Sequence, residues 1–235
     1  MYCTDFIKNR KLFRARSLFK MTRIIVDASD IVLQDFTLEN KDQLFELIDR
    51  NREHLRDWLF WVDFTKTPED SLNFIESVMI SNEQKKSLVL GMWRGNELLG
   101  AVFLVNIQDE FAELGYWICQ EEQGKGYITV ASQALINFTF ENYAIAAIRI
   151  KCVAANTHSH AVIRRLDLPC ISIPDETQWI HGEQSTEEIA MFCGEITRPE
   201  WALRQQDRMK HGFFLPSQAE LKQTPILLEP KLSHN

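Results

Sequence analysis

A glycine-containing loop between a strand-like segment and a helix-like segment is the part of this sequence best suited to chemistry. The loop residues are Gln123, Gly124, Lys125, Gly126, Tyr127, Ile128 and Thr129. Backbone N–H groups at a helix start, together with the helix dipole, bind anions, and glycines let a pyrophosphate approach the backbone closely. The pattern predicts an anion site, although an ordinary glycine-containing turn also explains it.

Two common nucleotide-binding loops do not match this segment. A nucleoside triphosphate loop follows the pattern GxxxxGK[ST], and here its first glycine would fall at Cys119. Its last position would fall at Gly126, where Ser or Thr is required. A dinucleotide loop follows GxGxxG, and here Thr129 replaces the third glycine. A different phosphate-bearing ligand is therefore expected.

Histidine and cysteine spacing does not predict a metal site. His158 and His160 form an HxH pair with no third ligand nearby, which is more typical of solvated loop histidines. The five cysteines are odd in number and contain no CxxC pair. A zinc site or a disulfide framework is therefore not expected, and a reducing cytoplasm fits the composition. The aromatic cluster of Trp58, Trp61 and Phe64 is more typical of a core than of an acceptor groove.

The elements that must position the loop alternate between strand and helix patterns. Apolar segments predict strands at residues 31–36, 87–93, 98–105, 112–119, 148–153 and 189–196. Helices are predicted from Thr67-Pro68-Glu69-Asp70 onward, with a buried face of Leu72, Ile75, Val78 and Met79, and at residues 127–142 and 156–166. This order predicts an α+β domain over residues 22–201.

The two ends of the chain differ from this domain. Residues 1–21 are predicted to be a basic, flexible N-terminal extension, and residues 202–235 a partly mobile tail with a short helix near 203–210. Residues 1–20 carry a net charge of +5, which leaves −12 for the remainder of a chain whose net charge is −7. That balance argues against direct nucleic-acid binding, and no apolar run reaches the length of a membrane span.

In this order and spacing, the motifs resemble the GNAT superfamily of N-acetyltransferases, and within it the RimJ/RimL-like subgroup of ribosomal-protein N-terminal acetyltransferases. The resemblance covers most of residues 22–201. The motifs that carry it are Glu113-Leu114-Gly115-Tyr116-Trp117, Gln123-Gly124-Lys125-Gly126, Asn156-Thr157-His158-Ser159, Trp58-Leu59-Phe60-Trp61, Thr67-Pro68-Glu69-Asp70 and Arg198-Pro199-Glu200-Trp201. Ile128 departs from the glycine or alanine that ends the family's pyrophosphate loop.

The resemblance implies a largely antiparallel sheet in which two parallel strands, here 112–119 and 148–153, splay apart and hold acetyl-CoA, the expected co-substrate. The pantetheine arm would pair with exposed strand backbone, and the pyrophosphate would bind the loop. The implied cofactor-binding residues are Trp117, Ile118, Gln123, Gly124, Lys125, Gly126, Tyr127, Ile128, Thr129 and Asn156.

Acyl transfer to an amine needs a base, donors for the oxyanion and a hydrogen bond to the leaving sulfur. Glu113 is the candidate base, although an edge carboxylate satisfied by a neighbour is an equal explanation. A backbone N–H near Trp117 is the candidate oxyanion donor. By resemblance, Ser159 would protonate or hydrogen-bond the sulfur; the alternative is that Asn156 or Thr157 simply caps a helix.

The acceptor is the least determined part of this hypothesis. The resemblance implies a protein α-amine, such as the N-terminus of a ribosomal protein, acetylated in the cytoplasm by a monomer or homodimer. A small amine, such as a polyamine or an aminoglycoside, and a non-catalytic acyl-CoA-binding role remain alternatives. After Arg165-Leu166 the family has Gly-Phe and an acidic hairpin, whereas this chain has Asp167-Leu168-Pro169-Cys170. Because Pro169 cannot donate to a ladder, a shortened or shifted strand is expected there.

Overall fold

The computed structural model describes residues 21–27, 29–180, 183–185 and 187–211. By its contacts the chain divides into two compact units, which meet between Arg198 and Pro199. All but Met21 of the basic extension predicted at residues 1–21, and residues 212–235 of the predicted tail, lie outside the described residues. The domain bounds of 22–201 therefore stay a prediction.

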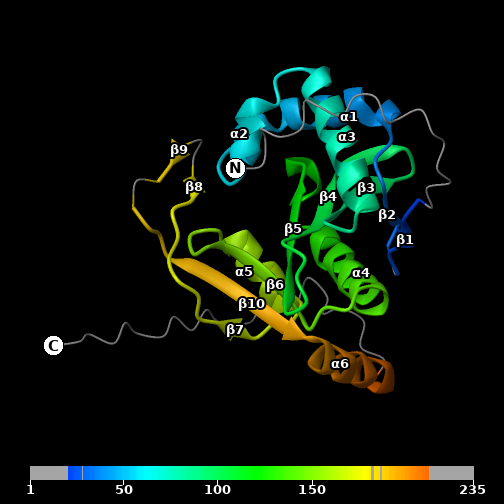
Figure 1. Cartoon of the computed structure of the whole chain (residues 1–235), viewed down its shortest axis with the longest axis vertical. Coiled ribbons are helices and arrows are strands. Elements are labelled where there is room, and N and C mark those ends of the chain that lie inside the picture. Colours follow the sequence, from blue (N-terminus) through cyan, green and yellow to red (C-terminus); the bar gives the residue numbers. More distant parts are fainter. Residues whose placement is uncertain (1–20, 28, 181–182, 186, 212–235) are drawn as a thin grey trace. The chain divides into compact units, whose positions relative to one another are not determined.

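The first unit is built on one eight-stranded sheet (Figure 1). Its strands, in spatial order, are β1 (Arg23–Ile25), β2 (Ile31–Gln34), β3 (Leu88–Arg94), β4 (Glu97–Val105), β5 (Phe111–Ile118), β6 (Ala147–Val153), β10 (Met191–Thr197) and β7 (Cys170–Ile171). Every neighbouring pair is antiparallel except β5 and β6, which are parallel. The predicted α+β class with a largely antiparallel sheet is confirmed.

Helices flank this sheet in two groups. The helix α1 packs against α3 and β4, and α3 also packs against β3, whereas α4 packs against β4, β5 and α5. The helices of the unit are α1 (Lys41–Arg50), α2 (Arg52–Leu55), α3 (Pro68–Glu83), α4 (Tyr127–Asn142) and α5 (Thr157–Arg165), with 3₁₀ turns η1 (Leu38–Asn40), η2 (Phe60–Phe64) and η3 (Gln120–Glu122). The last helix, α6 (Arg198–His211), belongs to the second unit from Pro199 onward and begins earlier than the predicted short helix.

The start of α3 follows from its sequence. The Thr67 hydroxyl accepts a hydrogen bond from the Asp70 N–H, and the Asp70 carboxylate accepts from the Thr67 N–H at 2.8 Å, which is a capping box. Pro68 occupies the first turn, where its missing N–H is not needed. The helix begins where it was predicted to begin.

The buried face of α3 differs from the predicted one. Its buried residues are Ser71, Ile75, Val78 and Asn82. Leu72 and Met79, which were predicted to face the core, are only half-buried. Asn82 replaces them because its amide donates to Asp35 at 2.9 Å and to the Val89 carbonyl at 3.1 Å. Asn82, a polar residue whose hydrogen bonds are satisfied, is therefore buried in the core, although the apolar periodicity of the helix did not predict it there.

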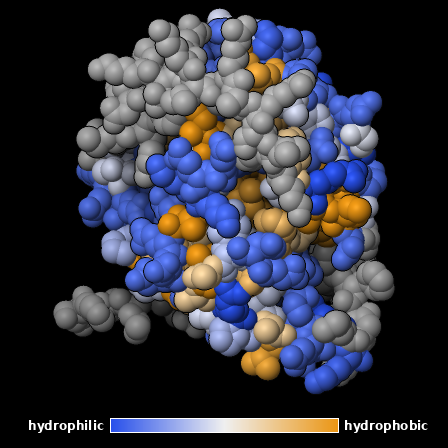
Figure 2. All heavy atoms as spheres, turned by 45° about the vertical axis from the view of Figure 1, so that its right-hand side comes forward, coloured by the Kyte–Doolittle hydropathy of each residue, from blue (hydrophilic) through white to orange (hydrophobic). Residues whose placement is uncertain are grey.

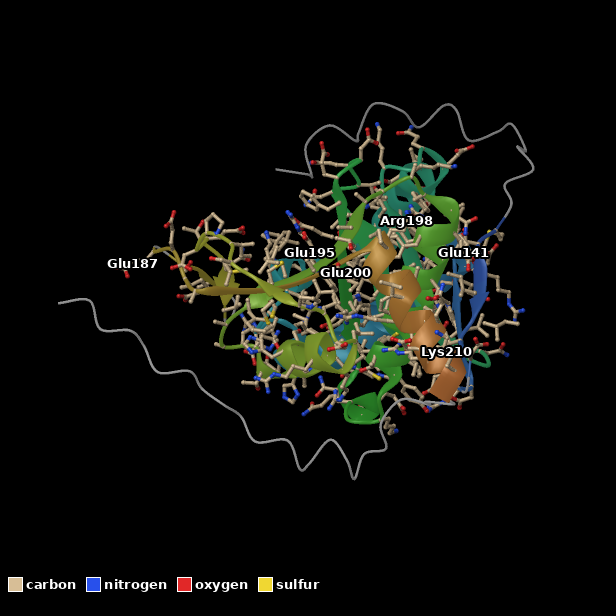
Figure 3. The ribbon with its side chains drawn as sticks, turned by 90° about the horizontal axis from the view of Figure 1, so that it is seen from below. Glu141, Glu187, Glu195, Arg198, Glu200 and Lys210 are labelled. Carbon is tan, nitrogen blue, oxygen red and sulfur yellow. The ribbon has the colours of Figure 1, made fainter. Side chains whose placement is uncertain are left out.

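The segment between α5 and β10 departs most from the sequence-based expectation. The strand β7 has only two residues, which confirms the predicted shortening after Pro169. A second sheet of two short strands, β8 (Trp179–Ile180) and β9 (Glu183–Gln184), was not predicted. In Figure 3, Glu187 lies at the far end of this excursion from Glu195 and Arg198.

Among the described residues, large apolar side chains are concentrated in the core. The core holds large, fully buried aliphatic side chains, among them Leu33, Leu90, Leu99 and Leu104. On the face shown in Figure 2, hydrophobic residues form small groups between hydrophilic ones. None of the described helices combines the length and the apolar character that a membrane span requires.

Candidate functional site

A pocket of about 410 Å³ opens where the parallel strands β5 and β6 separate. The register of these strands ends at Glu113 opposite Arg149, although β5 continues to Ile118 and β6 to Val153. The two strands diverge visibly in Figure 1. Beyond Glu113, a strand edge on each side faces the gap, so an extended ligand has backbone groups with which to pair. The splayed strands expected from the sequence are therefore present.

The pocket gathers almost all of the predicted site residues. Those that line it are Glu113, Trp117, Ile118, Gln123, Gly124, Gly126, Tyr127, Ile128, Thr129, Asn156 and Ser159. Lys125 does not line it, because its ammonium group turns to the Glu122 carboxylate at 2.8 Å. Residues far apart in the sequence are thus brought to one cavity.

The loop before α4 has the geometry of an anion site. Gly124 and Gly126 adopt φ angles of +73° and +84°, which glycine tolerates and other residues rarely adopt. A Cβ atom at either position would meet no atom within 4 Å, so the backbone there is open. The Thr129 hydroxyl is buried and has no hydrogen-bond partner among the described residues. An oxyanion at the start of α4 would satisfy this hydroxyl and the unpaired N–H groups of the first turn.

An ion-pair cluster, defined by Arg94, Glu122 and Lys125, holds this loop at the edge of the pocket, which Glu122 itself lines. The Arg94 guanidinium contacts both oxygens of Glu122, at 3.0 and 3.1 Å, and also acts on the Tyr127 side chain. Arg94 therefore binds Glu122 before the glycines and lies near Tyr127 after them. Hydrogen bonds from Arg94, and then from Lys125, hold the pKa of Glu122 below its usual range.

Two contacts join the region of α1 and α2 to the same loop. The side-chain oxygen Oδ1 of Asn51 accepts a hydrogen bond from the Gln120 backbone N–H at 2.8 Å. The Gln123 side-chain amide lies 2.6 Å from Nε2 of His54. Burial, and to a smaller degree the nearby His158, lowers the pKa of His54, against opposing effects of nearby acidic groups. The neutral imidazole is therefore favoured beside Gln123.

The candidate base Glu113 already has protein partners. Its carboxylate accepts a hydrogen bond from the Asn106 amide at 3.0 Å and lies 3.9 Å from the Lys151 ammonium group. Lys151 is bound more closely by Glu176, at 3.0 Å. Glu113 is therefore held at the closed end of the fork, where β5 and β6 are still paired.

The start of α5 places Asn156 and Ser159 together. The Asn156 side chain accepts a hydrogen bond from the Ser159 N–H at 3.0 Å, so Asn156 caps the helix. The capping explanation is thus correct for Asn156, and it fixes the Ser159 backbone at the pocket. His158 is exposed, whereas the His160 ring stacks on Phe192 with ring centroids 4.0 Å apart. These histidines lie on a helix, not on the predicted loop.

The aromatic cluster divides between the pocket and the surface. Trp58 lines the pocket, and Trp61 packs edge-to-face on Trp117 with ring centroids 5.9 Å apart. Phe64 is 64% exposed, so a core position is wrong for it.

Gly115 leaves room for the Phe103 ring, because an added Cβ would meet that ring at 2.2 Å. The Phe103 side chain therefore occupies the space that the absence of a side chain at Gly115 leaves on the strand.

Several pocket residues were missed by sequence reasoning. They are His54, Tyr116, Cys152 and Arg165, and the loop-holding pair Arg94 and Glu122 lies outside the predicted set as well. Burial raises the pKa of the Cys152 thiol to about 12. Within the described residues, no group of three His, Cys, Asp or Glu side chains is placed to bind a metal ion. The sequence could have indicated two of these residues. Tyr116 lies within the motif Glu113-Leu114-Gly115-Tyr116-Trp117, and Arg165 lies on the helix that begins with the motif Asn156-Thr157-His158-Ser159.

Acetyl-CoA fits the features of this pocket. Its phosphates match an open glycine loop and the unpaired Thr129 hydroxyl. Its extended pantetheine arm matches the free strand edges beyond Glu113. The buried, unpaired phenol of Tyr116 adds a polar group beside the fork. The thioester would then lie between the strands and the start of α5.

Comparison with known proteins agrees with this geometry. The chain is 26% identical over 147 residues to the ribosomal-protein-serine acetyltransferase of Escherichia coli (strain K12), covering 62% of this chain and 82% of that protein. It is 33% identical over 137 residues to YdaF of Bacillus subtilis (strain 168), named as a candidate ribosomal N-acetyltransferase, covering 55% of this chain and 73% of that protein.

Among solved structures, the microcin C7 self-immunity acetyltransferase MccE in complex with acetyl-CoA and AMP is similar with a TM-score of 0.66. It is 26% identical, and the match covers 71% of this chain and 92% of that chain. A family model described as an acetyltransferase (GNAT) domain matches residues 30–168, more than half of the chain. On this match, together with the fork and the glycine loop, the chain belongs to the GNAT acetyltransferases and uses acetyl-CoA as its co-substrate.

Proposed function

We propose that this enzyme transfers the acetyl group of acetyl-CoA to the α-amine of a protein N-terminus. The observation that carries the proposal is one pocket that joins the strand fork, the glycine loop and the start of α5. Two relatives support the choice of acceptor: one is named a ribosomal-protein-serine acetyltransferase, and the name of the other describes a ribosomal N-acetyltransferase.

In this proposal the backbone of β5 at Trp117 and Ile118 pairs with the pantetheine arm. Gly124, Gly126 and the first turn of α4, including the Thr129 hydroxyl, bind the pyrophosphate. The other proposed contacts with the cofactor come from Gln123, Lys125, Tyr127, Ile128 and Asn156. Lys125 would have to leave Glu122, or act on the phosphates through its charge alone.

The chemical step needs three groups around the thioester. Glu113 accepts the proton of the attacking amine, directly or through water. A backbone N–H near Trp117 donates to the tetrahedral oxyanion. Ser159 donates a hydrogen bond to the sulfur as the C–S bond breaks. Asn106 and Lys151 keep the Glu113 carboxylate in place for this role.

Two walls flank the pocket and leave a path for a peptide acceptor. One wall comes from α2 and the residues after it, including His54 and Trp58. The other comes from Lys151 on β6, Gln178 in the segment before β10, and Met191 at the start of β10. An N-terminus that enters between them carries its amine toward Glu113.

We place the reaction in the cytoplasm, in a monomer or homodimer that does not bind nucleic acid directly. The described cysteines Cys119, Cys152, Cys170 and Cys193 are free thiols, which suits a reducing compartment. The acidic net charge of −7 disfavours a nucleic-acid partner.

The test is acetyl transfer to synthetic peptides that begin with unblocked Ser or Ala. Matched peptides with an acetylated N-terminus, and with an internal lysine as the sole amine, serve as controls. Mass spectrometry of the product and release of the CoA thiol give the readouts. We expect transfer to the free α-amine only. Binding of CoA without transfer to any amine would instead indicate a non-catalytic acyl-CoA-binding protein.

A small-molecule amine is the second candidate, because MccE, an immunity acetyltransferase, shares 26% identity with this chain. Polyamines and an aminoglycoside, tested beside the peptides at equal concentration, separate the two candidates by kcat/KM. For whichever acceptor reacts, Glu113→Gln should remove the acidic limb of the pH–rate profile if Glu113 is the base. The same acceptor must be used for both enzymes, since its own amine also titrates.

A further inference from the structure

The phenol of Tyr116 is a buried polar group that the proposed function does not use. Its oxygen is shielded from solvent and makes no hydrogen bond of normal geometry within the described residues. Tyr116 lies on the splayed part of β5, and its side chain lines the pocket. A buried hydroxyl in a folded protein ordinarily has a partner, so this one points to an interaction that is completed during function.

Ser159 lines the same pocket and lies close enough to influence the phenol, although the two hydroxyl groups do not form a hydrogen bond of normal geometry. Burial raises the pKa of Tyr116, and Ser159 opposes that rise in part. The phenol therefore keeps its proton and can donate it in a hydrogen bond at neutral pH. Ser159 is well placed to accept a hydrogen bond from the phenol. Its backbone N–H is held by Oδ1 of Asn156 at 3.0 Å, and no other side chain of the described residues forms a hydrogen bond with its hydroxyl.

We propose that Tyr116 is a positioning residue that acts through Ser159: the phenol donates to Oγ of Ser159, so that the Ser159 hydrogen points to the leaving sulfur. The inference rests on the role of Ser159 in the proposed function. A serine hydroxyl has one hydrogen and rotates freely, and a donor on its oxygen restricts where that hydrogen points. The benefit should appear in the transition state, where the sulfur gains negative charge.

In this proposal, acetyl transfer does not require Tyr116 or Ser159 to give up a proton. The amine nitrogen forms a bond to the carbonyl carbon, and its proton goes to Glu113 or to water. The C–S bond then breaks, and its electron pair stays on sulfur as a thiolate. Ser159 and Tyr116 keep their protons and stabilise that thiolate by hydrogen bonding, and the thiolate takes a proton from solvent after release.

The experiment is a double-mutant cycle of Tyr116→Phe, Ser159→Ala and the combined variant. The probe is the pair of acetyl-CoA and a synthetic peptide with an unblocked N-terminal Ser, with kcat and the KM for acetyl-CoA measured separately. Tyr143→Phe is the matched control, since Tyr143 is also half-buried but does not line the pocket. Thermal unfolding of each variant reports on packing.

We expect Tyr116→Phe to lower kcat roughly two- to tenfold, the range of one neutral hydrogen bond, with little change in KM. In the Ser159→Ala background the same change should have no further effect, because the group through which it acts is gone. Tyr143→Phe should leave both constants unchanged.

Three results would overturn the inference: an unchanged kcat in Tyr116→Phe, effects that multiply in the double variant, or a raised KM alone. The last would mean that the phenol binds acetyl-CoA itself. The role of Ser159 fails separately, if Ser159→Ala turns over at the wild-type rate.

Discussion

Arg94 and Glu122, 28 residues apart in the chain, form a two-point ion pair beside the glycine loop. The Glu122 side chain is only 9% exposed, although it carries a charge. Arg94 and Lys125 together satisfy that charge, and the loop between Glu122 and Tyr127 is thereby fixed at both of its ends. A loop fixed before the ligand arrives loses less conformational entropy when phosphate binds.

Replacing Arg94 with Lys should weaken acetyl-CoA binding while leaving the fold intact. Lysine keeps the positive charge but cannot contact both Glu122 oxygens and Tyr127 at once. We expect the KM for acetyl-CoA to rise about three- to tenfold with a smaller effect on kcat. Arg56→Lys, which alters an ion pair with Asp63 outside the pocket, is the control. Equal KM values for the two variants would contradict the role of Arg94.

The same pair predicts a dependence of stability on acidity. Because Arg94 and Lys125 lower the pKa of Glu122 from 4.5, the charged form is more stable in the folded state. This contribution is complete above about pH 4.5 and is lost as the pH falls through the lowered folded pKa. Unfolding temperatures of the wild type and Glu122→Gln should therefore differ at neutral pH and converge in acid. A difference that stays constant down to about pH 3 would refute this.

A charge placed on the glycine loop should block the cofactor. Gly126→Glu puts a carboxylate where the pyrophosphate approaches the backbone, and its φ of +84° adds strain. We expect CoA binding, measured by calorimetry, to fall at least about tenfold, roughly 1.4 kcal/mol. Gly126→Ala carries the strain without the charge, and its Cβ meets no neighbour within 4 Å. Unchanged affinity in a folded Gly126→Glu protein would remove the loop from the cofactor site.

Arg165 should contribute to cofactor binding, whereas its neighbour Arg164 should not. Arg165 lines the pocket and has no ion pair or hydrogen bond among the described residues, while Arg164 is exposed outside the pocket. We expect Arg165→Gln to raise the KM for acetyl-CoA about tenfold and Arg164→Gln to leave it unchanged. Acetyl-dephospho-CoA, which lacks the 3′-phosphate, then identifies the phosphate involved. Identical KM values for the two variants would show that Arg165 binds no phosphate.

The sequence was most informative where chemistry and local backbone geometry coincide. The loop from Gln123 to Gly126 needs glycines in a left-handed conformation before a helix start, and both glycines adopt it. The fork was also predictable, because the family motif on β5 fixes which strand edge must remain unpaired. Pro169, which lacks an N–H, correctly predicted a short strand β7.

Features that depend on tertiary contacts were not predictable. The buried face of α4 includes the polar residues Thr129, Ser132 and Thr139, which a search for apolar periodicity does not select. Arg94 and Glu122 become partners only when β3 and the loop are folded together. Asp167 adopts a left-handed φ of +57° directly after α5, a conformation that aspartate tolerates better than most residues but that no local pattern here requires.

The half-buried thiol of Cys152, which lines the pocket, has a consequence for the fidelity of acyl transfer. A thiolate that lines a thioester pocket would exchange with acetyl-CoA and leave the enzyme acetylated on its own cysteine. With a pKa of about 12, the Cys152 sulfur stays protonated and is a poor nucleophile at neutral pH. Cys152 therefore does not compete with the incoming amine for the acetyl group, and self-acetylation at this sulfur is disfavoured.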